Sequence, residues 1–209
     1  MGILKGPISY AKFYVTGDLP DGFQDRFLES IALRRFVPLT VEGEDVQSIG
    51  WAPLARPHEN DVGFDHNDVF FNSYLNLVLR IDEWKFPSVV FKTAFEEAAK
   101  KHLEERGREK LTRREKEELK VVVSRKLRHQ FSPVMKTVDL SWNLSTNVLR
   151  FWNQSARMEE ILVEIFEKTF PCKLMVSSPY TMAMHAGLSE QQLQVLQTIE
   201  PAAFHSLTM

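Results

Sequence analysis

The sequence predicts an α+β protein in which a helical hairpin is inserted into a body of strands and helices. Segments with the alternation of a β-strand and segments with the period of a helix follow one another along most of the 209 residues. The stretch 87–131 differs, because it contains two helical segments in succession and no strand. We therefore expect residues 1–86 and 132–209 to form one α+β central body, from which 87–131 protrudes as an antiparallel helical pair.

The elements of the body follow from the spacing of apolar residues and from glycine and proline at the turns. Before the hairpin, the pattern predicts a strand over 8–15, a helix over 21–35, an irregular segment over 40–67 with Trp51 in the core, and strands over 69–72 and 74–84. After it, the pattern predicts a β-hairpin of strands 133–144 and 147–153, a helix over 157–169, a strand over 173–176, and a last helix from Ser189 to near Pro201.

Alternation within the predicted strand 74–84 indicates that only one face is buried. Leucines and Ile81 occupy every second position, and the positions between them include Arg80 and Asp82. Because successive side chains of a strand point to opposite faces, we expect Arg80 and Asp82 on the exposed face.

Local signals define both helices of the hairpin. Pro87 suits a first helical turn, where its missing N–H would have no partner. Gly107 interrupts the helical pattern, and Thr112 with Glu115 fits a capping box that starts the second helix. Each helix carries one apolar stripe, so we expect the two stripes to pack against each other.

The hairpin concentrates the positive charge of the chain. Residues 87–131 contain 13 Lys and Arg against 8 Glu, a net charge of +5, whereas the whole chain has 26 against 28, a net charge of −2. The remainder therefore carries −7. An acidic body with a basic arm favours an anionic partner such as phosphate for the arm, and the same charge run is also typical of an ordinary solvated helix with i,i+4 ion pairs.

Several short motifs occur in a characteristic order around this arm. They are G-W-x-P at Gly50, Trp51 and Pro53, P-S-x-V-x-K at Pro87, Ser88, Val90 and Lys92, E-K-x-x-L-K at Glu115, Lys116, Leu119 and Lys120, and a closing Phe131. This order resembles the RdgC family of bacterial recombination-associated DNA-binding proteins. The resemblance extends over roughly residues 8–179. Residues 126–131 depart from it, because they read K-L-R-H-Q-F where the family has L-L-P-x-A-F.

The resemblance implies an α+β centre with a helical tip and a base domain, of which this chain would lack most. It further implies two subunits that close a ring around double-stranded DNA, bind it without sequence preference and limit access of the recombinase RecA. We accordingly expect a cytoplasmic, nucleoid-associated homodimer that modulates homologous recombination and needs no cofactor. Helix geometry and the resemblance together predict these DNA-binding residues: Lys100, Lys101, Arg113, Lys116, Lys120, Arg128 and Phe131.

Two other classes of function stay open at this level. An exonuclease activity has sometimes been attached to the RdgC family, and the acids and histidines between His58 and Asp68, or Glu83 and Lys85 as an E-x-K pair, would be its candidate residues. Their spacing matches no metal-binding motif, so we predict neither a catalytic nor a metal site. A protein-protein adaptor would instead use the charged hairpin as a docking arm.

Bulk properties agree with a globular protein outside the membrane. The 44% hydrophobic residues suffice for a core, and no apolar run approaches the ~20 residues that cross a bilayer. The single cysteine, Cys172, excludes an internal disulfide, and we expect a buried structural thiol there.

Overall fold

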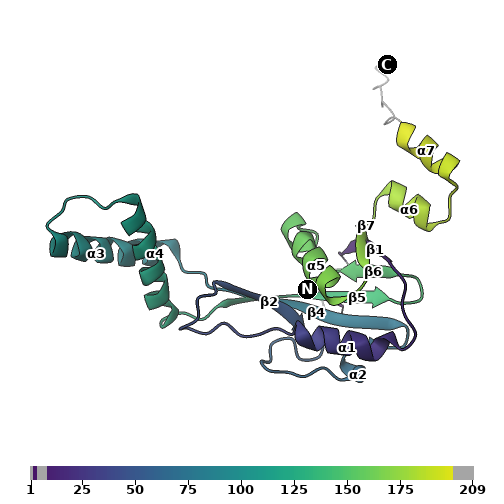
Figure 1. The fold of residues 1–209 in the computed structure, drawn as a ribbon, viewed down its shortest axis with the longest axis horizontal. Coiled ribbons are helices and arrows are strands. Elements are labelled where there is room, and N and C mark those ends of the chain that lie inside the picture. The colour runs from purple at the N-terminus through teal and green to yellow at the C-terminus, as the bar shows by residue number, and fades with distance from the viewer. Residues whose placement is uncertain (1, 4–8, 200–209) are drawn as a thin grey trace, which may run out of the picture. The chain divides into compact units, whose positions relative to one another are not determined.

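The computed structural model describes residues 2–3 and 9–199, and it confirms the α+β class (Figure 1). The strands of this part of the chain form an antiparallel sheet, in which they are hydrogen-bonded in the order β2-β4-β5-β6-β1-β7, and β3 pairs with β4. The elements in chain order are β1 Ala11–Thr16, α1 Phe23–Leu33, β2 Gln47–Ala52, α2 His66–Val69, β3 Phe70–Phe71, β4 Tyr74–Glu83, α3 Ser88–Arg106, α4 Arg113–Arg128, β5 Val134–Asn143, β6 Val148–Phe151, α5 Ala156–Thr169, β7 Lys173–Val176, α6 Pro179–His185 and α7 Glu190–Thr198.

The chain forms two compact units, whose division differs from the predicted one. The body unit comprises Met1–Leu33, Phe64–Leu77 and Val138–Met209, and the hairpin unit comprises Arg34–Gly63 and Val78–Thr137. Residues 34–63 and the second half of β4 thus belong with the helical hairpin rather than with the body. The reason is that the second half of β4 pairs with β2, while residues 42–44 contact the end of α4.

In the body unit, α1 and α5 pack on the same face of the sheet. Trp142 of β5 is fully buried there, and its ring lies 5.9 Å from that of Phe27 on α1 and 5.4 Å from that of Phe166 on α5. Phe170, just after α5, completes this aromatic cluster at 4.8 Å from Phe27. Each ring in such a cluster buries a large apolar area and therefore stabilises the packing of helices on the sheet.

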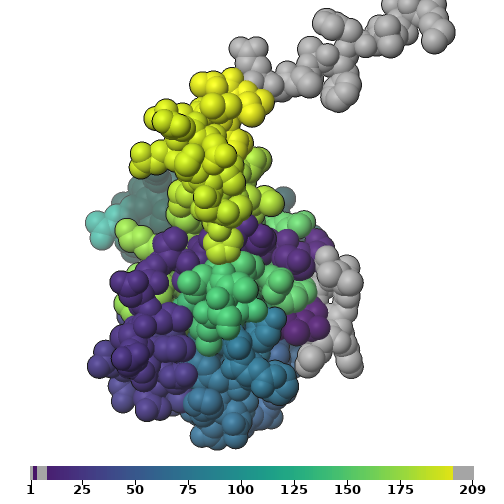
Figure 2. Space-filling model, turned by 90° about the vertical axis from the view of Figure 1, so that its right-hand side faces the viewer, coloured from purple at the N-terminus to yellow at the C-terminus, as the bar shows by residue number. Residues whose placement is uncertain are grey.

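Strand register in the body unit is set by β1, which lies between β6 and β7. Phe13 pairs with Leu149 on one side and with Val176 on the other. On the surface of this unit, the segments around α1, α2 and the β5–β6 turn lie side by side, in purple, blue and green in Figure 2. A hydrogen bond from the Leu144 N–H to the Ser73 carbonyl joins the last two of these segments.

Most predicted elements are confirmed, and the deviations lie in short ones. The first strand begins at Ala11, and the part of the prediction that includes Ile8 lies outside the described residues, as does the predicted helix end near Pro201. The structure adds α2 and α6, which the sequence analysis did not predict. Both are short helices that begin with a capping box. At α6, Ser178 and Thr181 each bond to the backbone N–H of the other.

In the hairpin unit, the strand β2 corrects the prediction of an irregular segment over 40–67. It pairs with β4 from Gln47↔Glu83 to Ala52↔Val78. Its other edge is covered by residues 34–37, since the Phe36 N–H bonds to the Trp51 carbonyl at 2.8 Å and the Trp51 N–H bonds to the Arg34 carbonyl at 2.9 Å. Trp51 is 1% exposed, as predicted.

The prediction that Arg80 and Asp82 lie on an exposed face is wrong. Both are buried, and they form a two-pronged ion pair with Nε–Oδ1 and Nη2–Oδ2 distances of 3.1 and 2.9 Å. The guanidinium also donates to the Glu59 carbonyl and stacks 3.9 Å from the centre of the Phe36 ring. The second face of β4 is therefore buried by residues 36 and 59, which are distant in sequence. The ion pair between Arg80 and Asp82 offsets the desolvation cost of burying the two charges.

Gly50 is the residue that lets the backbone at Phe36 approach β2. A Cβ added to Gly50 would lie 2.4 Å from the Phe36 Cα and 2.5 Å from its nitrogen, which no real Cβ tolerates. We expect Gly50→Ala to lower the free energy of unfolding by about 1–3 kcal/mol, because the clash is with backbone and the strand edge must shift. Urea denaturation followed by tryptophan fluorescence measures the change.

The matched control is Gly63→Ala, because a Cβ at Gly63 meets no atom within 4 Å. We expect this control to alter the unfolding free energy by less than about 0.5 kcal/mol. Equal stability of the Gly50 and Gly63 variants would contradict the assigned packing of β2 against Phe36.

Candidate nucleic-acid interface

The predicted helical hairpin is present, with its break at the predicted residue. α3 ends at Gly107, which adopts the left-handed conformation at φ 61° and ψ 35° and donates its N–H to the carbonyls of Leu103 and Glu104. α4 begins after Thr112, and both hydrogen bonds of the Thr112–Glu115 capping box are formed. The contacts at both ends show that the helices run in opposite directions: Arg106 reaches Glu115 at one end, and Phe86 contacts Phe131 at the other.

Glu115 connects the two helices at the turn of the hairpin. Its Oε2 accepts hydrogen bonds from the N–H and the hydroxyl of Thr112, both at 2.9 Å. Its Oε1 lies 2.8 Å from Arg106, 3.4 Å from Arg108 and 3.6 Å from His102. The Thr112 N–H, followed by the Thr112 hydroxyl, lowers the pKa of Glu115 to about 2, with His102 and Arg108 acting in the same direction against the effect of burial. This carboxylate is therefore ionised at any ordinary pH.

Five of the predicted DNA-binding cations are exposed near this turn or on the following part of α4. Lys100 and Lys101 are about 80% exposed and lie 3.9 and 4.0 Å from Glu104 and Glu105. Lys120 pairs with Glu117 at 2.9 Å. Arg113 and Lys116 are exposed and form no ion pair with any described residue. Exposed pairs of this kind are weak, so Lys100, Lys101 and Lys120 can exchange their glutamates for another anion, while Arg113 and Lys116 have no glutamate to release.

Three further cations of this region were not among the predicted DNA-binding residues. Arg106 and Arg108 are held by Glu115, and Lys110 lies exposed in the connection between the helices without an ion pair among the described residues. The sequence feature that indicates the position of Arg106 and Arg108 is the nearby capping-box glutamate, because its carboxylate attracts arginines of the preceding turn towards α4.

Two of the predicted DNA-binding residues do not lie on the solvent face of α4 where the helix geometry placed them. Arg128 is 4% exposed rather than on the solvent face of α4, since loop residue Gly43 and the ring of Trp84 cover it. Phe131 is half-buried, and its ring meets that of Phe86 edge-on at 5.8 Å. Phe131 thus packs the base of the hairpin, so neither residue belongs to the exposed basic surface.

Apolar side chains are also exposed on the hairpin. α3 has no buried residue, and its Val89 is 74% exposed, while Val121 and Val122 of α4 are 53% and 59% exposed. The two predicted apolar stripes therefore bury each other only in part. This surface could contact another protein as well as an extended ligand.

The residues proposed for an alternative nuclease site have local structural partners. Asp65 and Asp68 cap α2, the His66 ring lies 4.9 Å from that of Phe70, and Glu83 forms an ion pair with Lys85 at 2.8 Å. Among the described residues, no group of three or more His, Cys, Asp or Glu is arranged to hold a metal ion. Cys172 is buried, and burial, followed by the nearby Asp18, raises the pKa of its thiol.

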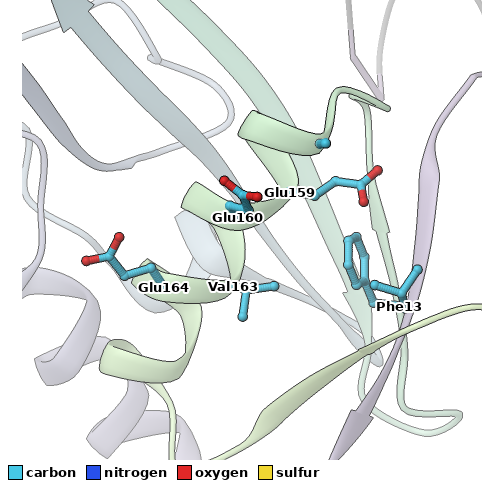
Figure 3. Close-up of a pocket in the computed structure, with 7 residues that line it drawn as sticks. Phe13, Glu159, Glu160, Val163 and Glu164 are labelled. Atoms are coloured by element: carbon cyan, nitrogen blue, oxygen red, sulfur yellow. The ribbon is translucent and has the colours of Figure 1, made fainter.

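The body unit presents a pocket of opposite charge. A hollow of about 450 Å³ lies beside α5, and its lining includes Phe13, Val163 and the glutamates Glu159, Glu160 and Glu164 (Figure 3). Glu159 and Glu160 have no ion pair within the described part of the chain, and Lys168 lowers the pKa of Glu164. Carboxylates in this arrangement repel phosphate, so the pocket is not a nucleic-acid site.

Comparison with known proteins found no family model and no curated protein sequence that matches the chain. Across residues 2–3 and 9–199, no helix combines the length and the apolar character that a membrane crossing requires.

We expect Glu115→Gln to destabilise the turn of the hairpin. At pH 7 the variant should melt roughly 2–4 °C below the parent, as on loss of a helix cap, because a neutral amide holds the Thr112 and arginine donors less well. Since the pKa of Glu115 is lower in the folded protein than its usual 4.5, its contribution is full above about pH 4.5 and is lost as the pH falls towards 2. The difference in melting temperature should shrink over that range.

Circular dichroism melts from pH 7 to pH 2 test this expectation. Glu118→Gln is the matched control, because Glu118 sits on the same helix but forms only an exposed pair with Arg114. It should change the melting temperature by less than about 1 °C. A pH-independent difference between parent and Glu115→Gln would show that the carboxylate charge is not what holds the turn.

Proposed function

We propose that the protein binds double-stranded DNA without sequence preference through the exposed cations of the helical hairpin. The observation that carries the proposal is the group of exposed lysines and arginines around the hairpin turn, opposed only by weak ion pairs. The residues are Lys100, Lys101, Arg113, Lys116 and Lys120, joined by Lys110. Such a surface neutralises phosphates and releases counterions, which provides affinity without reading bases.

The distribution of charge supports the same function. The +5 of residues 87–131 contrasts with −7 in the rest of the chain, including the carboxylates around the pocket beside α5. A duplex would be attracted to the hairpin and repelled by the body, so the hairpin would meet DNA first. The resemblance to the RdgC family adds that the protein would act as a homodimer in the nucleoid and modulate recombination by limiting recombinase access.

A protein-docking arm is the second candidate function. It is favoured by the exposed valines of α3 and α4, because large exposed apolar groups on a charged arm are typical of a surface that contacts another protein. The two candidates differ in their response to salt: contacts to phosphate weaken steeply with salt, whereas apolar docking does not.

If about five phosphates are neutralised, the slope of log K against log salt should be about −4 to −5, at ~0.9 counterions per contact on B-form DNA. A fourfold increase in salt would then weaken binding by several hundredfold. Replacing Arg113, Lys116 and Lys120 together by Ala should reduce the slope by up to ~3 units and weaken binding equally for unrelated sequences. Fluorescence anisotropy with two labelled duplexes of different sequence measures both effects.

The control replaces three exposed cations of the body unit, Arg26, Arg157 and Lys173, by Ala and thus changes the net charge equally. It should keep nearly the parent slope. A parent protein with a flat salt response, or a hairpin variant that binds like this control, would overturn the DNA-binding proposal and leave the docking arm.

A further inference from the structure

Arg128 is a buried cation that lacks an anionic partner. Its side chain is 4% exposed, and one nitrogen, Nη1, donates to the Gly43 carbonyl while the guanidinium lies 5.5 Å from the centre of the Trp84 ring. Its Nε has no hydrogen-bond acceptor, and neither has the buried Nε1 of Trp84. No carboxylate among the described residues forms an ion pair with Arg128. Because a buried charge is costly unless it is paired, Arg128 retains the capacity to bind an anionic oxygen through Nε.

Beside the Trp84 ring, the loop of residues 40–46 covers Arg128, and it is here called the acidic loop. Three consecutive residues of this loop each direct an oxygen at the last turn of α4. Glu42 lies 3.7 Å from His129, the Gly43 carbonyl accepts from Arg128, and Glu44 lies 3.4 Å from Arg125. Residues 125, 128 and 129 share one face of the helix, because they are three and four positions apart.

The acidic loop therefore occupies a face that would suit phosphate oxygens. Three nitrogen-bearing side chains converge there, and one is an arginine whose Nε still lacks an acceptor. Arginine is well suited to phosphate, since its fork of donors can bind two oxygens at once. The loop supplies two carboxylates and a carbonyl in place of such oxygens.

We propose that the last turn of α4, with Arg125, Arg128 and His129, is a second phosphate-binding site that the acidic loop occupies in the absence of DNA. A backbone phosphate of duplex DNA replaces the loop's oxygens there. This inference deepens the proposed function and rests on it. The exposed cations near the hairpin turn make the first contacts, and the site under the loop adds to them when the loop is displaced.

The contacts of the loop are weak enough to exchange. The side chains of Glu42 and Glu44 are 87% and 92% exposed, so water and salt screen their attraction to His129 and Arg125. Two hydrogen bonds of the loop involve buried residues: the Gly43 carbonyl accepts from Arg128, and the Val46 carbonyl accepts from the N–H of Trp84 at 3.0 Å. A phosphate that replaces the loop keeps an acceptor for Arg128 and adds full negative charge, which strengthens the hydrogen bond.

The test is the double variant Glu42→Gln and Glu44→Gln in the full chain. Removing both carboxylates weakens the hold of the loop, so the variant should bind a duplex about three- to tenfold more tightly than the parent near 100 mM salt. If up to two more phosphates are engaged, the slope of log K against log salt should steepen by about 1–2 units. Adding Arg125→Gln to the double variant should remove most of this gain.

The control is Asp25→Asn with Glu29→Gln on α1, which changes the net charge by the same amount and removes no ion pair of the described residues. It should bind like the parent. If the parent binds DNA and the acidic-loop variant behaves like this control, the second site is wrong while the proposed function stands.

Two outcomes remain, and each decides the matter. If neither parent nor variant binds DNA, both the proposed function and the second site are wrong. Binding by the variant alone would support the second site and show that the exposed cations near the turn are insufficient by themselves. Circular dichroism of each protein before titration ensures that the comparison is between folded chains.

Discussion

The carboxylate of Glu115 is the constraint on which the helical hairpin depends. A pair of helices normally holds together through its buried apolar stripe, but here α3 has no buried residue and α4 buries only Val123 and Leu127 of its stripe. The turn is held in addition by one nearly buried carboxylate, which caps α4 and binds Arg106 at the end of α3 and Arg108 in the connection. Each of these bonds gains strength because the acceptor is charged, so one side chain holds both the start of α4 and the end of α3 at the turn.

This way of holding the turn affects the charge available to a ligand. Glu115 partly neutralises the charges of Arg106 and Arg108. Lys110, Arg113 and Lys116 have no ion pair within the described residues. The cations of α3 and the middle of α4 face glutamates of their own helices at up to 4.0 Å, in contacts that remain open to water. A basic surface built this way stays solvated and stable without DNA. It loses little interaction free energy when a phosphate replaces a glutamate, because exposed ion pairs are weak.

The cations at the two ends of α4 differ in where their oxygen partners come from and in how deeply these partners are buried. At the N-terminal end, the anion comes from α4 itself and is nearly buried, so it belongs to the folded structure. At the C-terminal end, the oxygens come from a loop more than 80 residues earlier in the sequence, and its two carboxylates are almost fully exposed. Only the second kind of contact can be given up without unfolding the helix, and for this reason we place an exchangeable phosphate site at that end.

The sequence by itself determined the α+β class, the two helices of the hairpin, the capping box at Thr112 and the concentration of positive charge, because each of these depends on residues within a few positions of one another. It did not determine β2, which exists because β4 pairs with it and because Gly50 admits the backbone of Phe36. Nor did it determine the burial of Arg80, Asp82 and Arg128. A helical wheel or a strand alternation says which side chains share a face, but only the tertiary structure decides whether solvent or a distant segment covers that face.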